Sequence, residues 1–161
     1  MRKQLIFPDE ASASPSWDAD WLDLERVTTV EVSSEDAAHP IESALLRGEA
    51  VPPDGWRAAG PGPQLVRLRF DSPQRLRRIR LRIDERTDER TQEFVLRWSS
   101  DGGKSFREIV RQQWTFSPRG ATREIEDYRI DLVPVTVLEL AITPDVSGGP
   151  SAASLAELRL A

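Results

Sequence analysis

Cysteine is absent from this 161-residue chain, and histidine occurs only once, as His39. Without cysteine the chain has no disulfide bonds and no thiolate chemistry, and a single imidazole excludes sites that need several histidine ligands. We therefore expect neither a metal site nor a cofactor. An enzyme mechanism that relies on imidazole as a general acid or base would have to use His39.

Long apolar runs are also missing. No stretch approaches the roughly 18 continuous apolar residues that are needed to cross a bilayer. The apolar run Leu5–Phe7 ends at Pro8, so no secretory signal is recognisable. These absences predict no membrane partner and a cytoplasmic location for the chain as given.

The charge balance is acidic, with 22 basic and 27 acidic side chains, a net charge of −5 and a pI near 5.0. Between Arg67 and Arg90 the balance is reversed, because nine arginines stand against five acids. A basic sheet face can contact phosphates, but no aromatic residue lies between Phe70 and Phe94 to stack on bases. We therefore interpret this stretch as a solvated sheet face and expect no nucleic-acid partner.

The first 25 residues form a distinct acidic segment that two prolines interrupt. It carries Trp17 and Trp21, and burial is the usual reason for a tryptophan in a folded chain. We predict an N-terminal arm over residues 1–25, either packed on the domain or extending from it. A single domain is expected over residues 26–161, a length that suits one hydrophobic core.

From residue 26 onward, short strand-like runs alternate with turn residues. In one run Ile79, Leu81 and Ile83 alternate with arginines, a period of two that places apolar groups on one face. Only Ile41–Leu46 favours a helical turn. The pattern predicts an all-β, two-sheet sandwich of about eight antiparallel strands. The runs are 26–32, 64–70, 75–83, 94–98, 106–116, 129–132, 136–143 and 155–160.

Several short motifs follow one another in a characteristic order. They are Val32-Ser33-Ser34-Glu35, Ala44-Leu45, Gly55-Trp56, Asp71-Ser72-Pro73 and Ser100-Asp101-Gly102. This order resembles that of discoidin, or F5/8 type C, domains and covers about residues 27–161. The resemblance implies a galactose-binding-like jelly roll, whose members mostly bind sugars, phospholipid head groups or proteins rather than catalyse reactions.

Two departures from the family pattern bear on metal binding and location. Many members have an Asp-Gly pair after the helical turn that contributes to a calcium site, whereas this sequence has Arg47-Gly48. An arginine at this position argues against calcium, which needs several oxygen ligands. The terminal cysteines of many extracellular members are missing too, so the resemblance implies a bacterial, cytosolic-type variant.

The resemblance also implies that loops at one end of the sandwich form the binding site. Here these loops correspond to Ala37–Gly62 and to the turns at Arg86–Thr91 and Ser117–Ala121. The residues that we expect to bind a ligand are His39, Trp56 and Arg57, with Arg90 and Arg119 nearby.

These residues also have structural interpretations. A lone histidine before a proline often makes only a local hydrogen bond, and the family often buries an aromatic residue at the position of Trp56. In the binding interpretation, Trp56 covers the apolar side of a pyranose ring. Arg57 then donates hydrogen bonds to hydroxyl or carboxylate oxygens.

The sequence contains no Gly-x-Ser-x-Gly elbow and no glycine-rich phosphate loop, so we predict no enzymatic activity. The favoured function is a non-enzymatic binding module that binds carbohydrate through the loops at one end of the sandwich. The alternative is a protein–protein interaction or assembly subunit that has lost the sugar site. The sequence leaves the ligand and the oligomeric state open.

Overall fold

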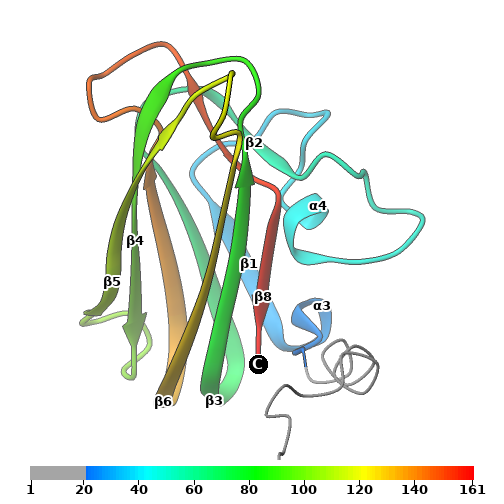
Figure 1. Cartoon of the computed structure of the whole chain (residues 1–161). Coiled ribbons are helices and arrows are strands. Elements are labelled where there is room, and N and C mark those ends of the chain that lie inside the picture. The colour runs from blue at the N-terminus through cyan, green and yellow to red at the C-terminus, as the bar shows by residue number, and fades with distance from the viewer. Residues whose placement is uncertain (1–20) are drawn as a thin grey trace, which may run out of the picture.

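The computed structural model describes residues 21–161 (Figure 1), so most of the predicted N-terminal arm lies outside the described residues. Strands dominate this part of the chain, and two short helices precede or interrupt them. The elements are α3 (Leu24–Val27), β1 (Thr28–Val32), α4 (Glu42–Leu45), β2 (Trp56–Pro61), β3 (Gln64–Asp84), β4 (Arg90–Ser99), β5 (Arg107–Phe116), β6 (Arg123–Thr143), β7 (Ala152–Leu155) and β8 (Glu157–Leu160).

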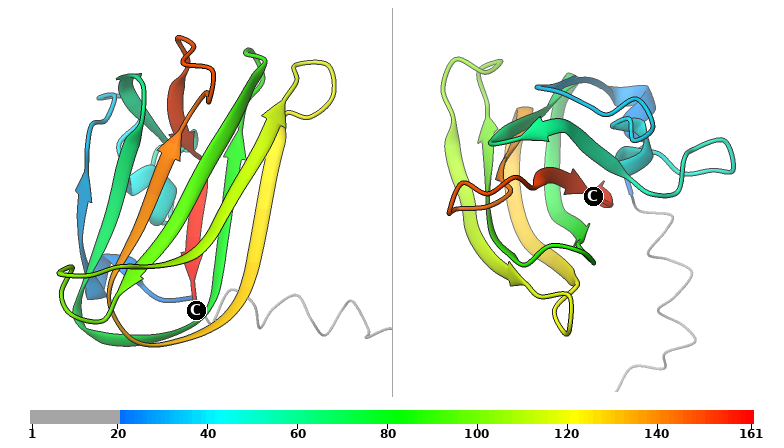
Figure 2. Two further views of the ribbon diagram at one scale, coloured as in Figure 1. Left: turned by 90° about the vertical axis from the view of Figure 1, so that its left-hand side faces the viewer. Right: turned by 90° about the horizontal axis from the view of Figure 1, so that it is seen from above.

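The long strands β3 and β6 form the frame of the fold, because they pair antiparallel with each other from one end of β3 to the other. The register is irregular between Arg69 and Arg78. Around this stretch both strands bend at the lower end of the molecule, so that each supplies one half to either layer (Figures 1 and 2). Irregular pairing of this kind lets a strand bend without ending.

Two layers result from this bend. One layer contains, in spatial order, β1, the first half of β3, the second half of β6, β4 and β5. The other layer contains β8 next to the second half of β3, followed by the first half of β6. β2 and β7 form a separate two-stranded sheet. All these pairs are antiparallel, and the all-β sandwich that was predicted is confirmed.

The core lies between the layers and follows the predicted alternation. Ile79, Leu81 and Ile83 are fully buried, whereas Arg80 and Arg82 between them are partly exposed on the outer face. Each fully buried aliphatic or aromatic side chain stabilises the fold by about 1.5–3 kcal/mol. The largest fully buried side chains are Trp56, Phe94, Phe116, Leu68, Leu76, Ile79, Leu81, Ile83, Leu96, Leu138, Leu140 and Ile142.

The structure divides the strands differently from the sequence. The sequence predicts two strands, 64–70 and 75–83, where the structure has the single strand β3, and it likewise splits β6. The segment Trp56–Pro61 forms β2, although its glycine- and proline-rich surroundings favour a loop. The predicted helical turn at Ile41–Leu46 is present as α4. Within residues 21–161, neither helix has the length and apolar character required to cross a membrane.

Candidate polar binding pocket

The loops at the upper end of the sandwich in Figure 1 surround a polar pocket of about 410 Å³. Its walls come from the loop before β2, the start of β2, the end of β3, the loop between β3 and β4, the first residue of β6 and the residue between β7 and β8. The lining residues are His39, Pro53, Asp54, Arg57, Arg82, Asp84, Glu85, Arg86, Thr87, Arg123 and Ala156.

Backbone hydrogen bonds bring two of the predicted site residues together in one wall. The amide of Arg57 donates to the carbonyl oxygen of His39 at 3.1 Å. The amide of Asp36 donates to the carbonyl oxygen of Arg57 at 2.8 Å. The loop that carries His39 is therefore fixed to the start of β2, and both side chains border the pocket.

Gly55 sets the position of this wall. Its φ of +72° lies in the left-handed region, and a Cβ atom there would lie 2.5 Å from the carbonyl oxygen of Leu155. Only glycine tolerates both conditions at once. As a result β2 begins directly against β7, with Trp56 paired to Leu155 and Arg57 paired to Ser154.

Two of the acids in the pocket already have cationic partners. Asp84 accepts a hydrogen bond from Nε of Arg123 at 2.8 Å, and its other oxygen lies 3.5 Å from Nε of Arg82. Glu85 accepts a hydrogen bond from Nε of Arg90 at 2.7 Å. Within residues 21–161, no three histidine, cysteine or acidic side chains gather closely enough to hold a metal ion.

Arg90, one of the predicted ligand-binding residues, lies beneath the pocket rather than at its surface. Only 3% of the residue is exposed, and its guanidinium packs 4.9 Å above the ring of Phe116. It donates to the side chain of Gln92 at 3.0 Å and to the carbonyl oxygen of Pro144 at 2.6 Å. Burial raises the pKa of Glu85, but the hydrogen bond and charge of Arg90, together with hydrogen bonds from Thr87, keep that pKa below its usual value. Arg90 therefore holds the loop between β3 and β4 in place.

Arg57 and Arg86 provide the cations of the pocket that are free to meet a ligand. Both are exposed, and neither guanidinium has a hydrogen bond or ion pair to any residue in the described range 21–161. Because Asp84 and Glu85 are engaged elsewhere, Asp54 is the remaining acid among the lining residues. The pocket thus offers more unengaged donors than acceptors.

His39 is partly buried at the edge of the pocket. Its Nδ1 atom lies 3.8 Å from the carboxylate of Asp36 and has no hydrogen-bond partner among the described residues. The same carboxylate accepts a hydrogen bond from the amide of Ala38 at 2.8 Å. Since this Nδ1 atom is buried, only the other ring nitrogen, Nε2, can bond a ligand in the pocket.

Trp56 is fully buried and contributes to the core. Its indole Nε1 donates to the carbonyl oxygen of Ser34 at 3.1 Å, which satisfies its one polar atom. A ring with no exposed surface cannot stack on a sugar in this conformation. The structure therefore supports the packing interpretation of Trp56. The residue contributes to the site indirectly, by anchoring Arg57 next to it in the chain.

Arg119, the last predicted site residue, lies in the exposed turn between β5 and β6 and is not among the pocket-lining residues. Arg82 and Arg123 line the pocket although they were not predicted to do so. From the sequence we assigned Arg82 to a solvated sheet face. No local sequence pattern indicates that this face lies beside the loops. The position of Arg82 one residue before the predicted end of the strand 75–83 was the available signal.

A second hollow of about 680 Å³ lies between residues 61–63 and 143–150. Proline and glycine make up most of its walls, and Asp145 is its only ionisable lining residue. The carboxylate of Asp145 accepts hydrogen bonds from the amide and hydroxyl of Ser147 at 3.0 and 2.7 Å. Since that acid is used within its own turn, the polar pocket is the better candidate site.

No model of a known protein family and no curated protein matches this sequence. Solved structures match it in fold. One is the family 32 carbohydrate-binding module of NanJ from C. perfringens in complex with galactose, with 14% identity and a TM-score of 0.59. The match covers 87% of this chain and 96% of that one. The chain has the discoidin-like, galactose-binding-like fold.

Two further structures share this galactose-binding-like sandwich. The family 32 module of AlyQ, in complex with 4,5-unsaturated mannuronic acid, is 21% identical with a TM-score of 0.54, covering 88% of this chain and 97% of that one. Reduced XRCC1, bound to the catalytic domain of DNA polymerase β, is 18% identical with a TM-score of 0.56, covering 84% and 95%. One neighbour binds a sugar acid and the other a protein, so the galactose-binding-like fold does not by itself select the ligand.

Proposed function

We propose that this chain is a carbohydrate-binding domain that receives an acidic sugar in the polar pocket. The observation that carries the proposal is the pair Arg57 and Arg86. Both guanidinium groups border the pocket without a partner among the described residues. A planar guanidinium matches a carboxylate with two parallel hydrogen bonds, which makes a uronic acid a better ligand than a neutral hexose.

The absence of phenylalanine, tyrosine and tryptophan from the described pocket lining supports the same choice. A neutral sugar gains much of its affinity by packing an apolar ring face on an aromatic side chain. No phenylalanine, tyrosine or tryptophan is among the lining residues here, and Trp56 is buried. Binding must therefore depend on hydrogen bonds and charge, and an anionic sugar gains most from both.

The proposal is for binding without catalysis. His39, the single imidazole of the chain, lies in a loop beside Asp36. The described pocket lining contains no serine or lysine that would serve as a nucleophile. The carboxylates of Asp84 and Glu85 are neutralised by arginines, which suits a structural role better than proton transfer. Solved neighbours in complex with galactose and with an unsaturated mannuronic acid lend support.

Isothermal titration calorimetry of galacturonic acid and galactose against the full chain tests the proposal. We expect galacturonic acid to bind more tightly, and its affinity to fall as the salt concentration rises. Arg57→Gln and Arg86→Gln should each weaken binding of galacturonic acid roughly fivefold or more, because each removes a charged hydrogen-bond donor. Arg107→Gln, on β5 and outside the pocket, is the matched control and should change nothing.

Equal affinity for the two sugars would contradict the role of charge. Unchanged binding in both pocket variants would show that the sugar binds elsewhere. If no sugar binds at all, that result favours the alternative of a protein-interaction subunit. Cross-linking in the native lysate is then the next experiment. That alternative and the cytoplasmic location remain predictions.

A further inference from the structure

Four arginines surround one carboxylate on the outer face of the layer that contains β8. Oε1 of Glu157 lies 3.2 Å from Nη1 of Arg80, 3.5 Å from Nε of Arg159 and 3.9 Å from Nη2 of Arg47. Its other oxygen lies 3.8 Å from Nη1 of Arg82. Arg82 also lies 3.5 Å from the carboxylate of Asp84, so two acids face these four arginines, on a chain whose net charge is −5.

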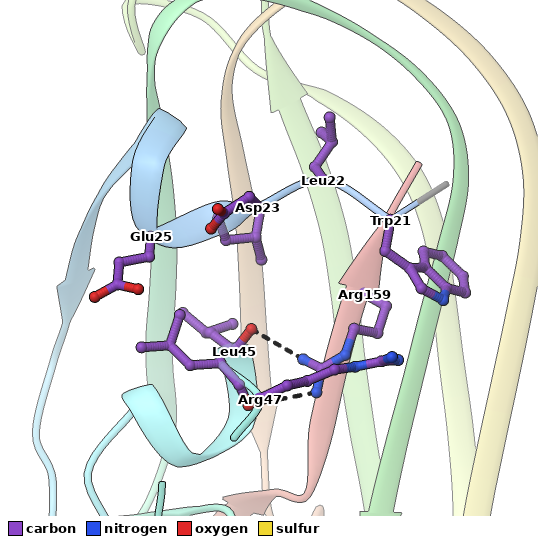
Figure 3. Close-up of a pocket in the computed structure, with 9 residues that line it drawn as sticks. Trp21, Leu22, Asp23, Glu25, Leu45, Arg47 and Arg159 are labelled. Carbon is purple, nitrogen blue, oxygen red and sulfur yellow. Dashed lines mark hydrogen bonds between the residues drawn. The ribbon is translucent and has the colours of Figure 1, made fainter. Parts of the chain in front are cut away.

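Arg159 has a structural task in this cluster. Its Nη1 donates to the carbonyl oxygens of Ala44 and Leu45, at 3.1 and 3.0 Å, and so joins the end of α4 to β8. Burial, reinforced by the surrounding arginines, lowers the pKa of its guanidinium. In Figure 3 the side chain of Arg47 lies alongside that of Arg159 but runs the opposite way, because Arg159 extends from β8 toward α4.

The other three arginines are accessible from solvent. The side chains of Arg47, Arg80 and Arg82 are 47%, 31% and 28% exposed, whereas that of Glu157 is only 16% exposed. Glu157 thus lies deeper than the three accessible cations around it. An anion that approaches this face meets the guanidinium groups first.

This cluster is continuous with the polar pocket. Arg82 lines the pocket and also approaches Glu157, and Ala156, another lining residue, directly precedes Glu157. Arg80 and Arg82 occupy alternate positions on β3, so their backbones are roughly 7 Å apart on one face. Positive charge therefore extends from the pocket along the outer face of β3.

We propose that Arg82, Arg80 and Arg47 form an arginine track that binds the successive carboxylates of a polyuronate chain. The inference rests on the proposed function, because it extends the pocket that would hold one acidic sugar. Linked carboxylates that bind pocket and track together gain affinity, since the second contact is intramolecular. The ligand class is therefore an acidic polysaccharide rather than a single sugar.

A polysaccharide fits this surface better than a nucleic acid. Single-stranded nucleic acids are bound by aromatic rings that alternate with basic side chains, and the track on β3 has no aromatic residue between its arginines. Trp21 borders Arg47 in the adjoining pocket, but its ring already packs against the guanidinium of Arg78 at 4.8 Å. Carboxylates on a sugar chain require only the guanidinium donors.

Titration calorimetry with galacturonic acid and with its hexamer tests the track on the full chain. The double variant Arg47→Gln/Arg80→Gln should bind the hexamer roughly tenfold more weakly and the monomer as the wild type does. The control Arg107→Gln/Arg111→Gln removes the same charge from β5 and should leave both affinities unchanged. Thermal melts confirm that each variant is folded.

The outcomes separate the track from the pocket. If the double variant binds the hexamer like the wild type, the track is overturned and the pocket stands. If Arg57→Gln has no effect while the double variant loses the hexamer, the pocket is overturned and the track stands. Tighter binding of a single-stranded oligonucleotide of equal charge would overturn the polysaccharide assignment, and no binding of any probe would overturn both proposals.

Discussion

The carboxylate of Glu124 lies 3.5 Å from the side-chain nitrogen of Gln92, and both residues are fully buried between the two layers. The second oxygen of Glu124 has no hydrogen-bond partner within the described part of the chain. Burial, followed by the charge of Glu126, raises the pKa of Glu124 to about 7, against the opposing effects of Arg90 and Gln92. Near neutral pH the folded protein therefore holds a partly protonated acid in its interior.

The substitution Glu124→Gln should stabilise the protein at alkaline pH. The pKa of Glu124 is about 7 in the folded state and 4.5 in the reference state. At pH values between these two, the folded state therefore binds more protons than the unfolded state. The linkage relation then makes the wild type lose stability as pH rises from 4.5 to 7, with no further loss above. Glutamine carries no charge to bury, and we expect a gain of up to roughly 3 kcal/mol at pH 8 and little change at pH 4.5.

Urea unfolding at the two pH values measures this difference. Glu49→Gln is the matched control, because Glu49 is exposed and its substitution should leave the pH dependence unchanged. An equal effect of Glu124→Gln at pH 4.5 and pH 8 would show that shape, not charge, decides the stability at this position.

Trp56 is expected to matter for stability and not for ligand contact. Replacing a fully buried tryptophan with alanine should destabilise the fold by about 3–5 kcal/mol, because it removes apolar contacts and leaves a cavity. Trp56→Phe should retain most of the packing and lose only the hydrogen bond to Ser34. Denaturant unfolding gives the stabilities, and calorimetry on the folded Trp56→Phe variant gives the affinity for galacturonic acid. A large loss of affinity in a stable Trp56→Phe variant would restore the stacking interpretation.

The alternation of apolar residues was enough to predict the sandwich, because burial of one strand face has a strict period of two. Ile79, Leu81 and Ile83 face the core as the pattern requires. The sequence did not predict that β3 and β6 continue through their bends. Asp71-Ser72-Pro73 has the composition of a turn, and only the long-range pairing of β3 with β6 turns it into a bend within one strand.

The site was less predictable than the fold, because its geometry depends on contacts between distant segments. His39 and Arg57 lie in the segment that the family resemblance indicated, and both line the pocket, while their role in ligand binding stays a prediction. Arg90 is adjacent in sequence to exposed residues, yet Glu85 and the carbonyl oxygen of Pro144 hold it in the interior. No local pattern distinguishes a buried arginine of this kind from an exposed one.

Gly55→Ala tests whether the close contact between β2 and β7 positions the pocket wall. A Cβ atom at residue 55 would meet the backbone of Leu155 and Ala156 at 2.5 and 2.7 Å, and a φ of +72° costs a non-glycine residue roughly 1–2 kcal/mol. Backbone atoms cannot yield as a flexible side chain does, so we expect a total destabilisation above about 2 kcal/mol in urea unfolding. Gly60→Ala, where a Cβ atom meets nothing within 4 Å, should change the stability little. In the folded fraction of Gly55→Ala, the displaced start of β2 should also weaken binding of galacturonic acid, because Arg57 moves with it. Stability and binding equal to those of Gly60→Ala would show that the contact between the two strands does not determine the position of Arg57.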